Sequence, residues 1–122
     1  MLLLCSFLAC KNSKTPASTT FPLMVDNRIF DFGVVDINDF DSIGFYFNLK
    51  NLGLKNVIIH DVEATCPCVR ISVKPDTISP GEYSLIGGKI GIKDSRGLQN
   101  KAIFVNYDDD KIMLLRIKGN LK

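Results

Sequence analysis

Residues 42–50 read SIGFYFNLK, and this stretch decides the fold because its apolar and polar side chains alternate. Ile43, Phe45, Phe47 and Leu49 fall on one face of an extended chain, and the polar or amphipathic residues between them fall on the other. This period of two is typical of a β-strand with one face against an apolar interior. The stretch therefore predicts a sandwich-type strand rather than a helix.

Similar short segments recur on both sides of this strand, and each ends in turn residues. Apolar or β-branched segments predict further strands at 29–32, 57–62, 86–92, 102–107 and 111–118. Turn residues separate them at 51–53, 78–82, 95–97 and 108–110. This spacing predicts an all-β fold, an Ig-like β-sandwich of about seven antiparallel strands, with a small closed barrel as the alternative.

The composition limits the function. The chain has 122 residues, 46% of them hydrophobic, and a formal net charge of +2. It fits one domain, and its charge is too small to predict a nucleic-acid partner. No nucleophile elbow, phosphate-binding glycine loop or His-Glu-x-x-His motif is present. The single histidine, His60, reads as a strand residue, so we expect no enzyme, no catalytic residue and no cofactor.

The first nine residues have the features of a targeting signal. Residues 1–9 are apolar and uncharged, and they are too few to span a bilayer but suit a secretory signal. They end in Phe-Leu-Ala before Cys10, which resembles a bacterial lipobox; Cys5 fits poorly because leucine precedes it. We expect residues 1–9 to be a lipoprotein signal peptide, 10–22 a lipidated cysteine and flexible tether, and 23–122 the sandwich domain. An apolar N-terminal strand is the alternative.

The targeting signal predicts the cellular location of the protein. We expect the chain in the bacterial cell envelope, held to a membrane by the lipid on Cys10, at the periplasmic face of the outer membrane. A displayed sandwich can bind through a sheet face, a loop or an edge strand. The leading hypothesis is therefore a non-enzymatic binding or structural module with an unidentified protein partner.

The segment Cys66-Pro67-Cys68 is the one chemical feature in the domain. In an extended strand, residues two apart point to the same side, so both sulfur atoms would lie together. The pair could be two buried free thiols, a local disulfide or the start of a soft-metal site. A metal would need further ligands, for which the chain offers His60, Met24 and Met113. The alternative function is therefore thiol-redox or soft-metal binding by Cys66 and Cys68.

The order of short motifs resembles a known family. The motifs are Phe30-Asp31-Phe32-Gly33, Phe45-x-Phe47-x-Leu49-x-Asn51-x-Gly53, Val57-x-Ile59, Cys66-x-Cys68, Ile78-x-Pro80-Gly81-Glu82, Gly97-x-x-x-Lys101 and Lys118-Gly119-Asn120. Together they are similar to the bacterial domain-of-unknown-function family 1573, over residues 28–121. The resemblance implies an Ig-like fold, and it implies that the protein, like many family members, is a lipoprotein. It implies no enzymatic reaction. Pro67 and Leu52 stand where the family commonly has glycine and threonine.

Overall fold

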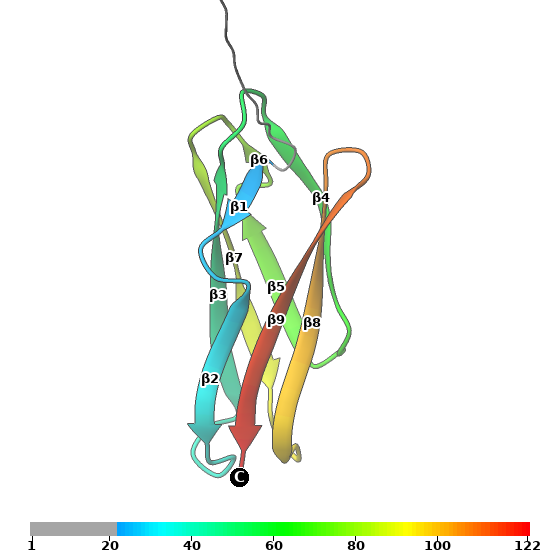
Figure 1. The fold of residues 1–122 in the computed structure, drawn as a ribbon. Helices are drawn as coiled ribbons and strands as arrows, with labels where there is room; N and C mark the ends of the chain where they lie inside the picture. The colour runs from blue at the N-terminus through cyan, green and yellow to red at the C-terminus, as the bar shows by residue number, and fades with distance from the viewer. Residues whose placement is uncertain (1–21) are drawn as a thin grey trace, which may run out of the picture.

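The computed structural model describes residues 22–122, which form nine β-strands (Figure 1). The strands are β1 (Leu23–Val25), β2 (Ile29–Val35), β3 (Ser42–Asn51), β4 (Val57–Ala64), β5 (Val69–Lys74), β6 (Thr77–Ile78), β7 (Tyr83–Gly91), β8 (Gly97–Tyr107) and β9 (Lys111–Leu121). The predicted signal peptide, the lipidation site Cys10 and nearly all of the predicted tether lie outside the described residues.

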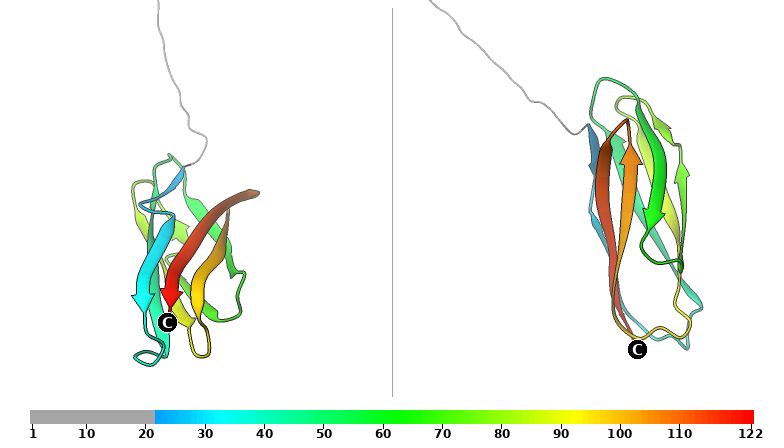
Figure 2. Two further views of the ribbon diagram at one scale, coloured as in Figure 1. Left: turned by 60° about the horizontal axis from the view of Figure 1, so that its bottom comes forward. Right: turned by 90° about the vertical axis from the view of Figure 1, so that its right-hand side faces the viewer.

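The strands form two sheets packed face to face (Figures 1 and 2). Sheet A has the order β1-β3-β7-β5, and sheet B has the order β2-β9-β8-β4-β6. All strand pairs are antiparallel except β2 and β9, which are parallel. This arrangement confirms the predicted all-β, Ig-like sandwich and not the closed barrel.

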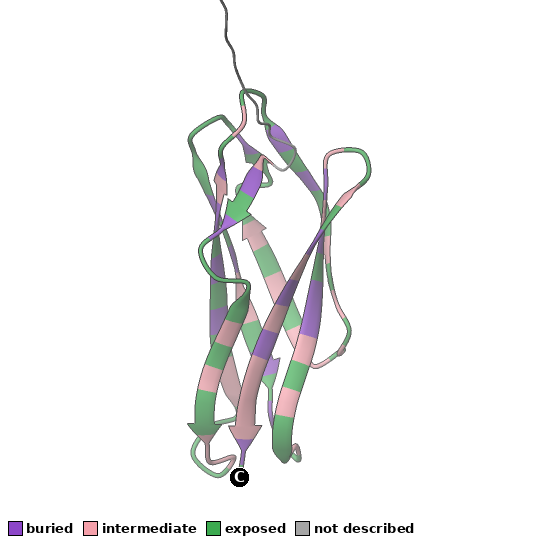
Figure 3. Ribbon diagram, viewed as in Figure 1, coloured by how far each residue is buried: buried purple, intermediate pink, exposed green. Residues whose placement is uncertain are grey.

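Buried and exposed residues alternate along the strands (Figure 3), and the buried apolar residues form one core cluster. The predicted inward residues Phe45, Phe47 and Leu49 of β3 are buried, and they face buried residues of β8 and β9. The largest fully buried apolar side chains are Leu49, Val57, Ile78, Ile86, Ile92, Ile103, Val105, Leu115 and Ile117. Burial of this much apolar surface is the main favourable contribution to folding.

Two of the predicted turns contain a glycine with a positive φ angle. Gly81 and Gly97 have φ angles of +80° and +86°, a conformation that glycine adopts without steric cost. The amide of Glu82 donates to the carbonyl of Ser79 at 2.9 Å and closes the first of these turns. Residues 108–110 form the turn between β8 and β9.

Several predicted strand limits are wrong, and the differences share a cause. Gly33 does not end its strand; its φ of +76° makes an irregularity inside β2, which continues to Val35. The first strand is divided, because β1 pairs with β3 in sheet A whereas β2 pairs with β9 in sheet B. The prediction also missed β1, β5 and β6. Pairing with a neighbour sets these limits, and local composition does not report it.

Candidate functional site

The predicted cysteine pair lies in a turn and not in an extended strand, which corrects the sequence-based prediction. Residues 65–68 connect β4 of sheet B to β5 of sheet A. The amide of Thr65 donates to the carbonyl of Ala102 in β8 at 3.0 Å. The amide of Gly91 in β7 donates to the carbonyl of Cys68 at 2.9 Å. These bonds fix the turn to both sheets at the point where the chain crosses between them.

The two sulfur atoms are bonded to each other in this structure, at 2.03 Å. The Cys68 amide also donates to the Cys66 sulfur at 3.2 Å. Both cysteines are half-buried, with Cys68 packed against the core, while Pro67 between them is exposed. The pair therefore has the disulfide form of the three predicted alternatives, and its redox role stays a prediction.

The residues considered as further metal ligands lie apart from this turn. Met113 is part of the core, and Met24 pairs with Lys50 at the opposite end of sheet A from Cys68. His60 is an exposed residue at an irregularity of β4. Within residues 22–122, no three His, Cys, Asp or Glu side chains lie close enough together to hold a metal ion.

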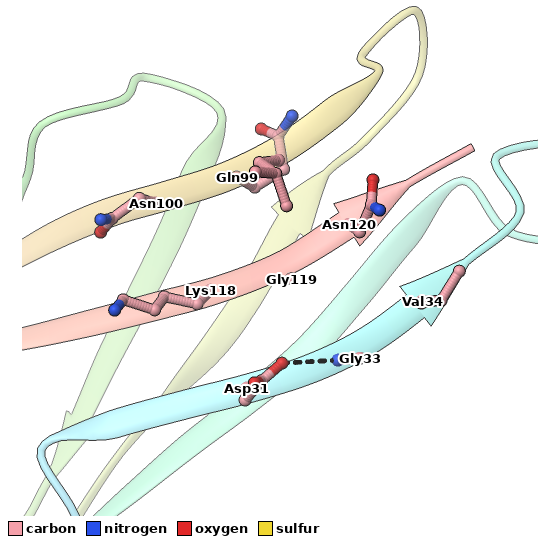
Figure 4. A pocket seen from close by; sticks show the side chains of 9 residues that line it. Asp31, Gly33, Val34, Gln99, Asn100, Lys118, Gly119 and Asn120 are labelled. Atoms are coloured by element: carbon pink, nitrogen blue, oxygen red, sulfur yellow. Dashed lines mark hydrogen bonds between the residues drawn. The ribbon is translucent and has the colours of Figure 1, made fainter.

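A groove that the sequence analysis missed lies on the outer face of sheet B, over β2, β9 and β8 (Figure 4). It has a volume of about 440 Å³. Strand register places Asp31, Lys118 and Asn100 in one row across the three strands. The next row contains Val34, Asn120 and Leu98.

Glycines and a bulge shape this groove. The register of β2 against β9 shifts between Asp31 and Val34. The Asp31 carboxylate accepts a hydrogen bond from the Gly33 amide at 2.8 Å, which holds the bulge in place (Figure 4). Gly33 contributes no side chain to the floor, and a β-bulge commonly redirects the side chains beside it. On the inner face, the ring of Phe32 occupies the space that a side chain at Gly119 would need.

The groove offers hydrogen-bonding groups between two exposed apolar side chains. A carboxylate, an ammonium group and the amides of Asn100 and Asn120 line its floor. Val34 and Leu98 flank it and are 65% and 86% exposed. These polar groups come from β2 and from the β8–β9 hairpin, which are far apart in sequence, so only the sheet brings them together. The available sequence signal was the alternation of polar residues along 116–120.

The two open sheets and the divided first strand define an Ig-like β-sandwich domain. The chain belongs to the family described as “Protein of unknown function (DUF1573)”, whose profile matches residues 23–121. This match confirms the family suggested by the motif order. No curated protein sequence matches the chain.

Several solved structures share this fold. One is a protein of unknown function from Porphyromonas gingivalis W83, with a TM-score of 0.70 and 15% identity. The match covers 90% of this chain and 53% of the Porphyromonas chain. The VesB protease of Vibrio cholerae has a TM-score of 0.62 and 14% identity, with 81% of this chain covering 32% of the protease. The PapD-like domain 7 of human CEP192 has a TM-score of 0.59 and 10% identity, covering 96% and 98% of the two chains.

These identities support the fold alone. The chain spans about half the length of the Porphyromonas protein and about a third of the protease. Within residues 22–122, no helix is long and apolar enough to cross a lipid bilayer.

Proposed function

We propose that this protein is a lipoprotein of the bacterial cell envelope whose sandwich is a non-enzymatic binding module. The apolar N-terminus ending at Cys10 supports the address, and a lipid there would hold the domain at the periplasmic face of the outer membrane. The observation that carries the binding role is the groove on sheet B, with Leu98 and Val34 exposed beside it.

The chemistry of the groove favours a protein or peptide partner. Protein interfaces combine apolar side chains that lose their water with a polar rim that forms hydrogen bonds. Leu98 and Val34 would supply the apolar contacts, and Asp31, Lys118 and Asn120 would supply donors and acceptors. The partner would thus be recognised by both shape and hydrogen bonding.

Photo-crosslinking in intact cells tests the groove. A photoreactive amino acid replaces Leu98, and the matched control places the same group at Leu54, which is 95% exposed in the loop between β3 and β4. We expect a discrete crosslinked species at position 98 and not at 54. Adding Lys118→Ala should weaken that species. Equal crosslinking at both positions, or none at 98, would contradict the proposal.

Mass spectrometry of the mature protein tests the lipid anchor. We expect an acylated N-terminal Cys10 and loss of residues 1–9, with the membrane fraction resisting a high-salt wash. Cys10→Ala should abolish the acylated product, whereas Cys5→Ala should leave it unchanged. A mature chain that retains Met1 with no acyl group would refute the anchor.

A second candidate function is thiol-disulfide exchange by Cys66 and Cys68. The disulfide in the turn between the two sheets is the observation that favours it. Its sulfur atoms belong to half-buried residues, and Pro67 between them is exposed, so an attacking thiolate has access from the solvent side.

Equilibration of the purified chain in redox buffers tests this candidate. We expect the pair to reduce and reoxidise reversibly, with a midpoint above about −300 mV, where structural disulfides are usually not reduced. Thiol counts on Cys66→Ser and Cys68→Ser identify the signal. A pair that stays oxidised through this range has a structural role only.

A further inference from the structure

The strands of sheet A carry positive charge and no acidic residues on their outward positions. Its strands β1, β3, β5 and β7 contain four cationic residues and no aspartate or glutamate: Lys50, Arg70, Lys74 and Lys89. The strands of sheet B contain both signs, with acidic residues at Asp31, Asp61 and Glu63. Because the inward positions of sheet A are apolar, its four cations lie on one side of the molecule.

Strand register places two tyrosines among these cations. Lys50 pairs with Tyr83, and its ammonium nitrogen lies 5.1 Å from the centre of the Tyr83 ring. Arg70 pairs with Lys89 at the other end of the same face. Tyr46 lies between these ends, and the two tyrosines are 57% and 59% exposed.

Glycines occupy several outward positions of this face beside its larger side chains. Gly44 pairs with Lys89 and Gly87 pairs with Tyr46, so the outward side chains of Lys89 and Tyr46 have no side chain directly opposite them. None of the residues that line the groove of sheet B belongs to this face. A sheet face with cations at both ends and exposed aromatic rings suits an extended anionic surface better than a small ligand.

We propose that this face binds an anionic lipid bilayer. Lys and Arg side chains are attracted to acidic headgroups, and tyrosine rings favour the boundary between headgroups and acyl chains. The inference deepens the proposed envelope role. In that role twelve residues lie between Cys10 and Leu23, where sheet A begins, and the distance from Cys10 to Leu23 is at most about 45 Å. Sheet A would lie on the membrane, and the groove of sheet B would face away from it.

Vesicle sedimentation of the mature chain, residues 10–122 with Cys10→Ser, tests the face without the lipid anchor and without the apolar residues 1–9. We expect binding to vesicles of equal parts phosphatidylglycerol and phosphatidylcholine, weaker binding at high salt, and none to phosphatidylcholine alone. Arg70→Gln with Lys74→Gln should weaken binding roughly 25-fold, at about fivefold per cation. Lys111→Gln with Arg116→Gln, which removes the same charges from β9 of sheet B outside the groove, should leave it nearly unchanged.

A tryptophan reporter gives an independent readout, because the chain contains no tryptophan. Tyr83→Trp should shift its emission to shorter wavelength on the mixed vesicles, whereas Phe104→Trp on the outer face of sheet B should not. If the first charge variant loses its β-sheet circular dichroism, Lys50→Gln with Lys89→Gln replaces it.

Three results would overturn the inference. They are no sedimentation with the anionic vesicles, equal loss from both charge pairs, and binding to a single-stranded oligonucleotide or a polyuronate but not to vesicles. Failure of the lipid anchor is distinguished from these results, since acylation at Cys10 is measured separately on the mature protein.

Discussion

At the scale of the single residue, the buried side chain of Asn51 joins three segments. Its amide nitrogen donates to the carbonyls of Lys55 and Ile78, at 2.7 and 2.8 Å, and its oxygen accepts from the Gly53 amide at 2.8 Å. The residue has no exposed surface, so water cannot replace these bonds. The asparagine therefore fixes the turn after β3 against the start of the β6–β7 connection.

Asn51→Ala should lower the free energy of unfolding by about 2–4 kcal/mol, because it leaves buried backbone groups without partners. Urea unfolding checks this, with a lower midpoint and an unchanged slope. The exposed Asn56→Ala is the control and should stay within about 0.5 kcal/mol of the wild type. Equal effects of the two changes would refute the structural role of Asn51.

Gly88 is needed because two neighbours occupy the space of a side chain. A Cβ atom there would overlap the backbone carbonyl of Arg70 in β5 and would lie 2.9 Å from the Phe45 ring. Gly88→Ala should destabilise the domain by about 1–3 kcal/mol through overpacking. Gly91→Ala in the same strand meets its nearest atom at 3.8 Å and should be much milder. Thermal unfolding of both variants tests this ranking.

Tyr107 links stability to alkaline pH. Burial raises the pKa of its phenol, nearby Asp108 raises it further, and Arg28 opposes them. In the unfolded chain the phenol ionises near pH ~10. Above that pH the folded state binds more protons, so the free energy of unfolding falls as pH rises.

Tyr107→Phe should remove this part of the alkaline loss. The difference in stability between variant and wild type should therefore shift in favour of the variant as the pH rises above about 10. Urea unfolding at neutral and alkaline pH measures it. A difference that does not change with pH would contradict the assignment.

At the scale of the element, β2 depends on its packing as much as on its hydrogen bonds. It is an edge strand paired with β9 alone, and it lines the proposed binding groove. The ring of Phe32 lies over Gly119 of β9, where no side chain opposes it. This ring anchors the strand to the sandwich.

Phe32→Ala should loosen β2 before the rest of the domain. We expect about 2 kcal/mol of destabilisation for this half-buried ring, together with faster amide exchange in β2 than in β3 or β7. Val34→Ala, which truncates an exposed side chain of the same strand, should leave that exchange unchanged. Uniform exchange across both sheets in the Phe32 variant would show that β2 has no separate anchor.

Strand β5 is an element that the sequence-based prediction missed. Residues 69–74 read Val-Arg-Ile-Ser-Val-Lys, an alternation as regular as that of β3. The prediction placed a strand at 57–62 and the cysteine pair in an extended strand, and it gave no strand at 69–74. The turn at 65–68 is set by hydrogen bonds to β8 and β7, which local sequence does not report.

At the scale of the whole molecule, we expect the sandwich to fold without its disulfide. The bond joins residues two apart, so it restricts a very short loop. A loop of this size contributes only roughly 1.5 kcal/mol through chain entropy. Cys66→Ser with Cys68→Ser should therefore keep the β-sheet circular dichroism and cooperative unfolding. Loss of folding in this variant would show that the turn is essential to the sandwich.

The sequence by itself determined the class of fold, the strands with strict alternation and the glycine turns, because burial of one strand face imposes a period of two on the residues themselves. Only the tertiary structure decided which strands share a sheet. Asp31, Asn100 and Lys118 meet through register, and Lys50, Arg70 and Lys89 gather on one face through strand order. Neither arrangement has a local signature, since pairing joins residues far apart along the chain.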